Sequence, residues 1–288
     1  MATNQHQETN PVFRELLAGS CAGVCEYTLL QPVDMACTRA MLNAASHDRT
    51  SMTEMISSVY KKGGATALFR GLGPQLMAAV PATCGMYAGE RFFNRLFQKP
   101  DGSTDVKRIW AAGACSGITE TLSVCPFEVI KVRLQSKEHL SKYKNTLHAI
   151  GTVLKREGPM ALYSGALPLM YRNGIFNGLF FTGCFVIREN IAPKPSSAVE
   201  SFMMDFVSGT IMGAVATPVK MPFFVVKTRM QAGGDKYTHG TFATMREIAK
   251  EEGARALWNG TLPAMVRMSL GGAVCLSSFR LFSRLLEG

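Results

Sequence analysis

Charged residues are scarce in this chain of 288 residues, at 18% against the ~25% usual for soluble domains. Those present are unbalanced, because 31 Lys and Arg stand against 21 Asp and Glu, which gives a formal net charge of +10. Such an excess favours nucleic acid, an anionic membrane surface or an anionic cargo as the partner. The mean hydropathy is only +0.09, so hydropathy alone does not establish a membrane protein.

Motifs of enzymes and of metal sites are missing. The eight cysteines are scattered without a C-x-x-C pair or a Cys/His metal spacing, which favours buried thiols over a zinc site or a disulfide framework. We find no Ser/His/Asp or Cys/His set, no Walker loop and no dinucleotide fingerprint. Residues 1–11 show neither a secretory signal nor an Arg-rich transit peptide, so we expect any organellar address to be internal. We therefore expect neither enzymatic activity nor a bound metal or cofactor.

A threefold internal repeat is the strongest positive signal in the sequence. In each copy two glycines stand four residues apart, and a proline follows nine residues beyond the second glycine. The three copies of this pattern end at Pro32, Pro126 and Pro222. A second pattern is an aromatic-x-Gly triplet with a proline three residues beyond it, and its glycines are Gly71, Gly165 and Gly260. The chain therefore consists of three copies of one unit.

Each unit contains two apolar segments. Residues 71–89 carry no charge over 19 residues, which is near the ~20 that span a bilayer. The other apolar segments are interrupted by charges, among them Glu120, Arg172, Asp205 and Arg267. Charges in spanning helices usually face a bundle interior or a water-filled cavity, so the low mean hydropathy is compatible with six spans. The G-x-x-x-G sequences would let neighbouring helices approach closely.

The loops inside the three units are basic and helix-prone, at residues 46–62, 136–157 and 233–252. Because each follows the first span of its unit, all three lie on one face of the membrane. The positive-inside rule assigns that face to the inside and both termini to the other face. A nucleic-acid-binding protein would gather its charge together with aromatic residues. Here the charge recurs once per unit beside a span, so we expect no nucleic-acid partner.

The triplicated motifs P-x-[DE]-x-x-[KR]-x-[KR] and [DE]-G-x4-aromatic-x-G resemble the mitochondrial carrier family over roughly residues 13–286. The resemblance implies three carrier repeats, at residues 13–98, 105–191 and 200–286. It implies an all-α membrane protein in which six transmembrane helices form a pseudo-threefold barrel with three short matrix helices. It also implies a monomer in the mitochondrial inner membrane with alternating access to one central site, although a peroxisomal location stays open.

Within the family, the chain is similar to the 2-oxodicarboxylate carriers and their succinate/fumarate relatives. The segments that carry this similarity are residues 117–120, 126–129, 172–177 and 271–274, together with Arg267. The similarity implies exchange of small carboxylates such as 2-oxoglutarate or 2-oxoadipate. A cargo of succinate/fumarate, citrate or another anion stays open, as do proton symport and a proton-leak or nucleotide-carrying activity on the same fold.

The resemblance also implies a gate on the matrix side, where the acid of each P-x-[DE] motif pairs with a base of the next repeat. The residues implied are the paired Asp34 and Lys131, the paired Glu128 and Lys227, and the bracing glutamines Gln135 and Gln231. Met41 takes the place of a glutamine in repeat 1. Ordinary surface charges would also explain these residues, but the triplicated register argues against that.

The third pair of this gate is missing, because its positions hold Phe224 and Cys37. One charge left unpaired in a partly dry gate would be costly, whereas replacement of both partners need not be. The joint replacement therefore supports the pairing scheme.

The opposite gate lacks its usual charges. The positions that hold acids in the family are Arg91, Phe185 and Arg280, and those that hold bases are Asn94, Arg188 and Ser283. No standard acid–base pair forms there, although Glu90 or Glu189 would serve in a rotated register. We therefore expect a weak cytoplasmic gate and a matrix-open state that is the less stable resting form.

An anion in the central site needs fixed cations, and arginine suits carboxylates because its planar fork donates two parallel hydrogen bonds. Arg172 and Arg267 each lie seven residues beyond the glycine of the aromatic-x-Gly triplet. The pair Arg172–Asn173 resembles the helix-4 contact of oxo- and dicarboxylate carriers. We expect Arg172 to bind one carboxylate and Arg267 to help bind the other, although Arg267 would also fit a role in gate coupling.

Two further positions belong to the expected substrate site. Lys220 lies one helical turn before Phe224 and shares its face, although a lysine there would also fit snorkelling toward a lipid headgroup. The relatives carry lysines on the second span, where this chain has Ala82 and Met86, with Thr83 nearby. This departure leaves the exact cargo open.

A lipid site is expected where the second span of each unit begins. Backbone amides and the helix dipole make such a start suitable for phosphate. The resemblance implies cardiolipin headgroups at Gly71, Gly165 and Gly260, although a plain helix start would give the same sequence.

Overall fold

The computed structural model describes residues 11–42, 51–97, 105–136, 142–191, 198–233, 237 and 240–287, and within them the regular structure is helical, without strands. The predicted all-α class is therefore confirmed. The long helices are α1 (Pro11–Leu42), α3 (Leu72–Phe97), α4 (Val106–Gln135), α6 (Ala166–Val186), α7 (Ala198–Ala232) and α9 (Thr261–Glu287). The shorter elements are α2 (Met52–Leu68), α5 (Thr146–Arg156) and α8 (Thr241–Glu251), with the turns η2 (Pro159–Tyr163), η3 (Ile187–Ile191) and η5 (Ala254–Trp258).

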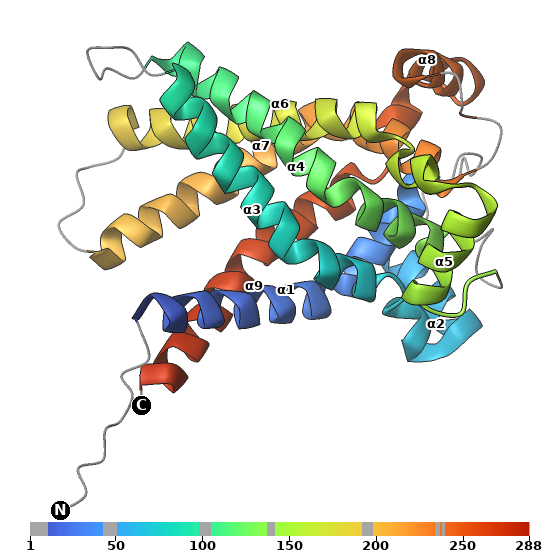
Figure 1. Ribbon diagram of the computed structural model, residues 1–288, viewed down its shortest axis with the longest axis horizontal. Coiled ribbons are helices and arrows are strands. Elements are labelled where there is room, and N and C mark those ends of the chain that lie inside the picture. The colour runs from blue at the N-terminus through green and yellow to red at the C-terminus, as the bar shows by residue number, and fades with distance from the viewer. Residues whose placement is uncertain are drawn as a thin grey trace, which may run out of the picture.

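The long helices form a ring. Helix α3 packs on α4, α4 on α6, α6 on α7 and α7 on α9, while α1 contacts both α9 and α3. Figure 1 shows α2, α5 and α8 at one end of the ring, which we call the short-helix end. The start of α1 and the finish of α9 lie at the opposite end, which we call the terminal end, and the long helices diverge toward it (Figure 1).

The buried core lies toward the short-helix end. The repeated prolines Pro32, Pro126 and Pro222 stand inside α1, α4 and α7, and the last turns beyond them contribute to all four buried apolar clusters. Proline removes one backbone hydrogen bond of a helix, so each of these helices is weakened where it enters the core. The helices therefore converge at one end around packed side chains.

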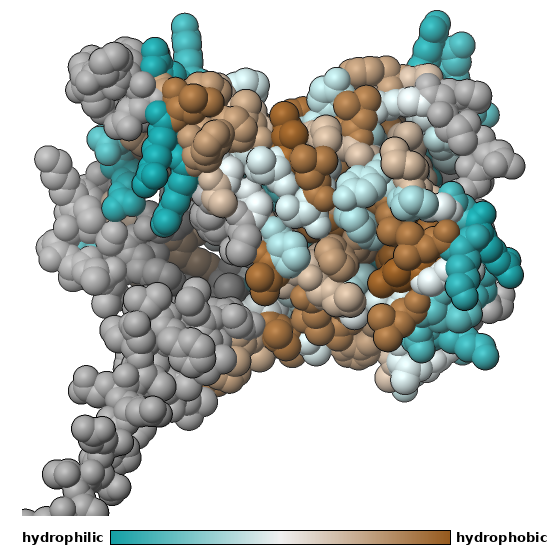
Figure 2. All heavy atoms as spheres, viewed as in Figure 1, coloured by the Kyte–Doolittle hydropathy of each residue, from teal (hydrophilic) through white to brown (hydrophobic). Residues whose placement is uncertain are grey.

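The outer surface of the ring is apolar. Large exposed hydrophobic residues such as Leu29, Val80 and Leu122 lie on the long helices. Figure 2 shows apolar groups in the middle of the described surface and hydrophilic groups toward both ends of the ring. By length and composition, one described segment, Phe206–Ala232, is apolar enough to cross a membrane alone. Several other long helices carry charged residues that line the ring interior, which lowers their mean hydropathy.

Helices α4 and α6 approach closely because α4 has glycines at the contact. A methyl group on Gly113 would lie 2.8 Å from the carbonyl oxygen of Asn177, and one on Gly117 would lie 2.6 Å from the carbonyl carbon of Asn173. Such a close approach leaves no room for a larger residue on α4. It holds two asparagines of α6 against α4, where they take part in the site described below.

Candidate functional site

A cavity of about 310 Å³ occupies the interior of the ring and is lined by all six long helices. Its charged lining comprises four carboxylates, those of Glu26, Asp34, Glu120 and Glu128. The cations are Lys131, Arg172, Lys220, Lys227 and Arg267. Three of the charges that interrupt the apolar segments of the sequence, Glu120, Arg172 and Arg267, thus line one cavity.

Asp34 joins four helices at the floor of this cavity. Its carboxylate pairs with Lys131 Nζ of α4 at 3.4 Å, as the repeat motif implied. It also accepts from Gln75 Nε2 of α3 at 2.8 Å and from Arg267 Nε of α9 at 3.1 Å. The expected gate acid and one expected cargo arginine therefore contact each other directly.

Glu128 has the equivalent place in repeat 2. It forms an ion pair with Lys227 of α7, and Arg172 Nη2 of α6 lies 3.4 Å from its Oε1. Lys227 is buried, so it depends on this carboxylate for compensation of its charge. Each expected cargo arginine thus shares an acid with an expected gate lysine.

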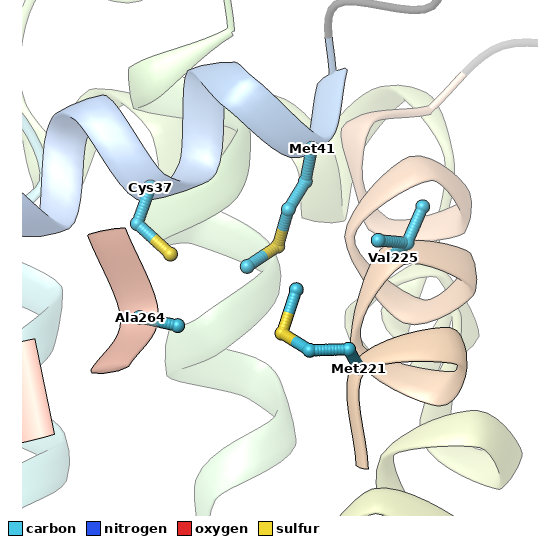
Figure 3. Packing of buried hydrophobic residues seen from close by; sticks show 5 residues of the cluster. All are labelled: Cys37, Met41, Met221, Val225 and Ala264. Carbon is cyan, nitrogen blue, oxygen red and sulfur yellow. The ribbon is translucent and has the colours of Figure 1, made fainter. Parts of the chain in front are cut away.

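The third position of the gate is apolar, as its sequence implied. Cys37 packs with Met41, Met221, Val225 and Ala264, and Figure 3 shows these side chains gathered between α1, α7 and α9. Phe224 packs against this cluster. A contact between α1 and α7 therefore replaces the missing ion pair without leaving a charge unpaired.

The ring of Phe224 also faces two cations. The guanidinium carbon of Arg172 lies 4.9 Å from the ring centroid and Lys227 Nζ lies 5.5 Å from it. A cation over an aromatic face is attracted by the quadrupole of the ring. The residue in the place of the third acid therefore still interacts favourably with positive charge.

The arginine that ends the P-x-[DE] motif was not singled out from the sequence, yet it links the repeats. Nε of Arg39, Arg133 and Arg229 donates to the carbonyl oxygen of Gln135, Gln231 and Met41, at 3.4, 3.4 and 3.0 Å. Its triplication was the signal that could have identified it. These bonds close the short-helix end of the ring.

The two expected bracing glutamines lie beyond the ion pairs rather than on them. The side chain of Gln135 donates to the carbonyl oxygen of Arg70 at 3.3 Å, and that of Gln231 reaches Cys125 Sγ at 3.9 Å. The amide that contacts a gate acid is instead Gln75. Its equivalents in the other repeats are Leu169 and Ala264, so no repeated pattern pointed to it.

Asn173 holds the side chain of Arg172 in place. Its Oδ1 accepts from Nε and Nη2 of Arg172 at 2.9 and 2.7 Å, and its Nδ2 donates to Thr121 Oγ1 of α4 at 3.2 Å. Asn173 is buried. In this conformation it orients the arginine expected to bind cargo.

Arg267 lies between two acids of α1. Besides Asp34, its Nη1 donates to Glu26 Oε1 at 2.9 Å. Glu26 was missed from the sequence, although it stands 94 residues before Glu120, three residues after the second glycine of the repeat. That offset was the signal that could have found it.

The remaining expected cargo residues are Lys220 and Thr83. The ammonium of Lys220 lies inside the ring, 3.6 Å from the ring centroid of Phe176, which places it in the cavity and not at the lipid-facing surface. The side chain of Thr83 lies outside the described residues. The described residues of α3 in this cavity and in the pocket beside it are uncharged.

The three glycines expected to bind lipid have a packing role. Gly71, Gly165 and Gly260 adopt φ of +88°, +70° and +85°, which favour glycine. A methyl group on Gly71 or Gly165 would lie 3.1 Å from the side chain of Gln135 or Gln231. Glycine is therefore required here for backbone conformation and for contact between repeats, whether or not lipid binds.

At the terminal end, the expected weak gate stays a prediction. Arg91 and Glu189 are exposed and Phe185 is half-buried. The side chains at 90, 280 and 283 lie outside the described residues.

A ring of long helices around a charged cavity defines a solute-carrier architecture, and comparison with known proteins identifies the family. The family model described as "Mitochondrial carrier protein" matches residues 8–101, 105–194 and 198–288. The chain belongs to the mitochondrial carrier family. This confirms the expected family and the location that it implies, as a multi-pass protein of the mitochondrial inner membrane.

Several relatives are similar over nearly their whole length. A "Probable mitochondrial 2-oxodicarboxylate carrier" of Schizosaccharomyces pombe is 31% identical over 91% of this chain and 90% of its own. The "Mitochondrial 2-oxodicarboxylate carrier" of Homo sapiens is 30% identical over 91% of each chain. The "Mitochondrial citrate transporter D" of Aspergillus niger is 28% identical over 97% of this chain and 96% of its own.

Proposed function

We propose that this chain exchanges small 2-oxodicarboxylates, such as 2-oxoglutarate or 2-oxoadipate, across the mitochondrial inner membrane, and that it acts as a carrier rather than an enzyme. The observation that carries the proposal is the placement of Arg172 and Arg267 in one cavity, each beside a gate acid. Two guanidinium groups on different helices suit a molecule with a carboxylate at each end. The names of the relatives from S. pombe and H. sapiens support the same cargo class.

The six long helices would act as the spans of a barrel. They are 21 to 35 residues long, which is enough to cross a hydrocarbon core of ~30 Å. Their apolar outer residues fit lipid, and their charges face inward. The basic loops favour a matrix location for the short-helix end, and in that orientation the described conformation would be closed on the matrix side.

Cargo binding would weaken the closed gate. A carboxylate that takes the guanidinium of Arg172 competes with Glu128, and one that takes Arg267 competes with Asp34. Each acid would then hold its gate lysine alone, and the ion pairs that join α6 to α4 and α9 to α1 would be lost. A ligand shifts a conformational equilibrium only by its differential affinity for the two states, and this competition supplies that difference.

Citrate is the second candidate cargo. The similarity to the A. niger citrate transporter supports it, and five cations line the cavity. The absence of charge on the described part of α3 in the cavity favours the smaller dicarboxylates, because a third carboxylate would need a further cation.

Cardiolipin is the proposed lipid partner, at the helix starts beside Gly71, Gly165 and Gly260. The positive ends of α3, α6 and α9 lie close to these glycines and suit phosphate. One chain encloses the whole cavity, so we propose that a monomer is sufficient for transport.

Uptake of labelled 2-oxoglutarate into proteoliposomes tests the proposal. The liposomes are preloaded with unlabelled di- or tricarboxylates, and Arg172→Ala and Arg172→Lys are assayed beside the wild type. We expect uptake that requires internal counter-substrate, fails in Arg172→Ala and is partly kept in Arg172→Lys. Wild-type protein with a cooperative thermal transition that carries no carboxylate would overturn the proposal, and preference for internal and external citrate would favour the second candidate.

A further inference from the structure

Two charged groups in the cavity stand apart from the others. Among the residues that the structure describes, Glu26 and Asp34 pair with Arg267, Asp34 also pairs with Lys131, and Glu128 pairs with Lys227 and Arg172. Within the same described set, Glu120 and Lys220 form no ion pair. One acid and one base of the nine charged lining groups are therefore not used by the gate.

Among the described side chains, the hydrogen-bond partner of Glu120 is an amide. Its Oε2 accepts from Asn177 Nδ2 of α6 at 2.9 Å, and Asn177, which is buried, also reaches Ser116 Oγ at 3.4 Å. An ionised carboxylate away from water is costly unless a cation or several donors compensate it. An amide donor also fits a neutral carboxyl group, so this site accommodates the protonated form.

The charged groups around Glu120 come from five helices. They are Glu26 and Asp34 of α1, Glu128 and Lys131 of α4, Arg172 of α6, Lys220 and Lys227 of α7, and Arg267 of α9. Cys37 and Tyr27 of α1 are the other titratable lining groups, and the described residues of α3 there are Gln75, Ala78 and Ala82. The nearest unused cation, Lys220, lies on the face of Phe176, which stabilises its charged form. Glu120 is thus the lining group best placed to change its charge.

The net charge of the cavity also favours protonation of Glu120 when an anion binds. Among the lining residues that the structure describes, five cations against four carboxylates leave one positive charge, which is one too few for a dicarboxylate dianion. Protonation of Glu120 would leave two positive charges and a neutral loaded cavity. A neutral loaded cavity avoids the cost of burying an uncompensated charge while the gates change.

We propose that Glu120 takes up one proton when a dicarboxylate dianion enters, so that the carrier moves one proton together with its anion. The inference rests on the proposed function. A proton from water forms an O–H bond on the carboxylate of Glu120, no other bond breaks, and the proton returns to water when the anion leaves. Exchange of one dianion for another then moves no net proton, whereas net uptake moves one proton per anion.

Calorimetric titration of the purified protein with 2-oxoglutarate, in buffers of different ionisation enthalpy, measures the protons taken up per bound anion. We expect proton uptake that approaches one per anion as the pH rises, and affinity that weakens by about tenfold per pH unit in that range. Glu120→Gln, whose amide oxygen can still accept from Asn177, should bind the anion with no proton uptake and with an affinity independent of pH. Glu120→Asp, which keeps a titratable carboxyl at this position, should keep the proton uptake.

Several results would overturn this inference. Anion binding by the wild type without proton uptake would do so, and so would proton uptake that persists in Glu120→Gln, which would point to Lys220 instead. Tighter binding of the 2-amino analogue than of the 2-oxo acid, without proton uptake, would show that Glu120 serves a cargo ammonium. Failure to bind any carboxylate would overturn the proposed function itself and is recognised by the absence of binding heat.

Discussion

Repeats 2 and 3 differ from repeat 1 at the positions that carry charge. Arg133 and Arg229 each bind a carboxylate with both terminal nitrogens, at 2.6 and 2.8 Å to Glu157 and at 2.5 and 2.7 Å to Glu252. In repeat 1 the place of that acid is taken by Gly63, and the arginine equivalent to Arg133 is Arg39.

The same division holds inside the cavity. Repeats 2 and 3 present Arg172 and Arg267, whereas repeat 1 has Ala78 in the equivalent place. Repeat 1 instead supplies acids, Glu26 and Asp34, that hold Arg267. The repeated glycines, prolines and linking arginines therefore maintain the same scaffold in all three copies. The positions at which the copies differ in charge form the cargo site.

The largest expected effect is on the cargo arginines of repeats 2 and 3. Truncating one partner of a buried charge pair between a protein and its ligand costs about 3–4 kcal/mol of binding, so Arg172→Ala or Arg267→Ala should lower kcat/KM for exchange by roughly 10²–10³-fold. Initial exchange rates in proteoliposomes check this. A loss of less than tenfold in both variants would show that neither arginine binds the cargo. Repeats 2 and 3 would then not differ in cargo binding from repeat 1, which has Ala78 in the equivalent place.

The next effect is on stability. Arg229 is 2% exposed and Glu252 10%, so Glu252→Gln should destabilise the protein by about 3 kcal/mol. Glu157 is 38% exposed, so water screens its pair with Arg133, and Glu157→Gln should cost about 1 kcal/mol. Thermal unfolding in detergent compares the two. Equal transitions for wild type and both variants would show that the missing acid of repeat 1 is of no consequence for stability.

An ion pair introduced at the third gate position should link repeat 3 to repeat 1 in the way that the two native pairs link the other repeats. The double variant Cys37→Lys/Phe224→Asp should show a favourable coupling of about 1–3 kcal/mol relative to the single variants, because the two new charges can pair with each other only when both are present. It should also exchange more slowly, since a stronger matrix gate opens less often. The unfolding transitions of the four proteins give the coupling, and additive effects would contradict the pairing of these two positions.

The smallest effect is expected for Phe224, whose aromatic ring stands where the third gate acid would be. Phe224→Leu should remove the attraction between the ring and Arg172, worth about 1 kcal/mol, and change KM by roughly fivefold with little change in stability. Phe224→Tyr keeps the ring and should keep the wild-type KM. Identical KM values for Leu and Tyr would show that the ring acts through packing alone.

Much of the arrangement was accessible from the sequence because a triplicated motif fixes the register of every copy at once. That register identified the acids and bases, and the resemblance to the carrier family implied the pairing of Lys131 with Asp34 and of Lys227 with Glu128. Gln75 was not accessible, because it occurs in a single repeat. The targets of Gln135 and Gln231 also depend on how far the helices converge at the short-helix end, which no local pattern specifies.

The central claim is that cargo opens the short-helix end by competing for the arginines that hold the gate acids. A disulfide between native Cys37 and Met221→Cys reports closure, because both positions lie in the cluster of Figure 3 and join α1 to α7. The measurement is the cross-linking yield in proteoliposomes, with the other seven cysteines replaced by alanine, with and without 2-oxoglutarate. We expect a yield that falls on addition of cargo and does not fall when Arg172→Ala is also present. A yield unaffected by a cargo that the protein transports would contradict this claim.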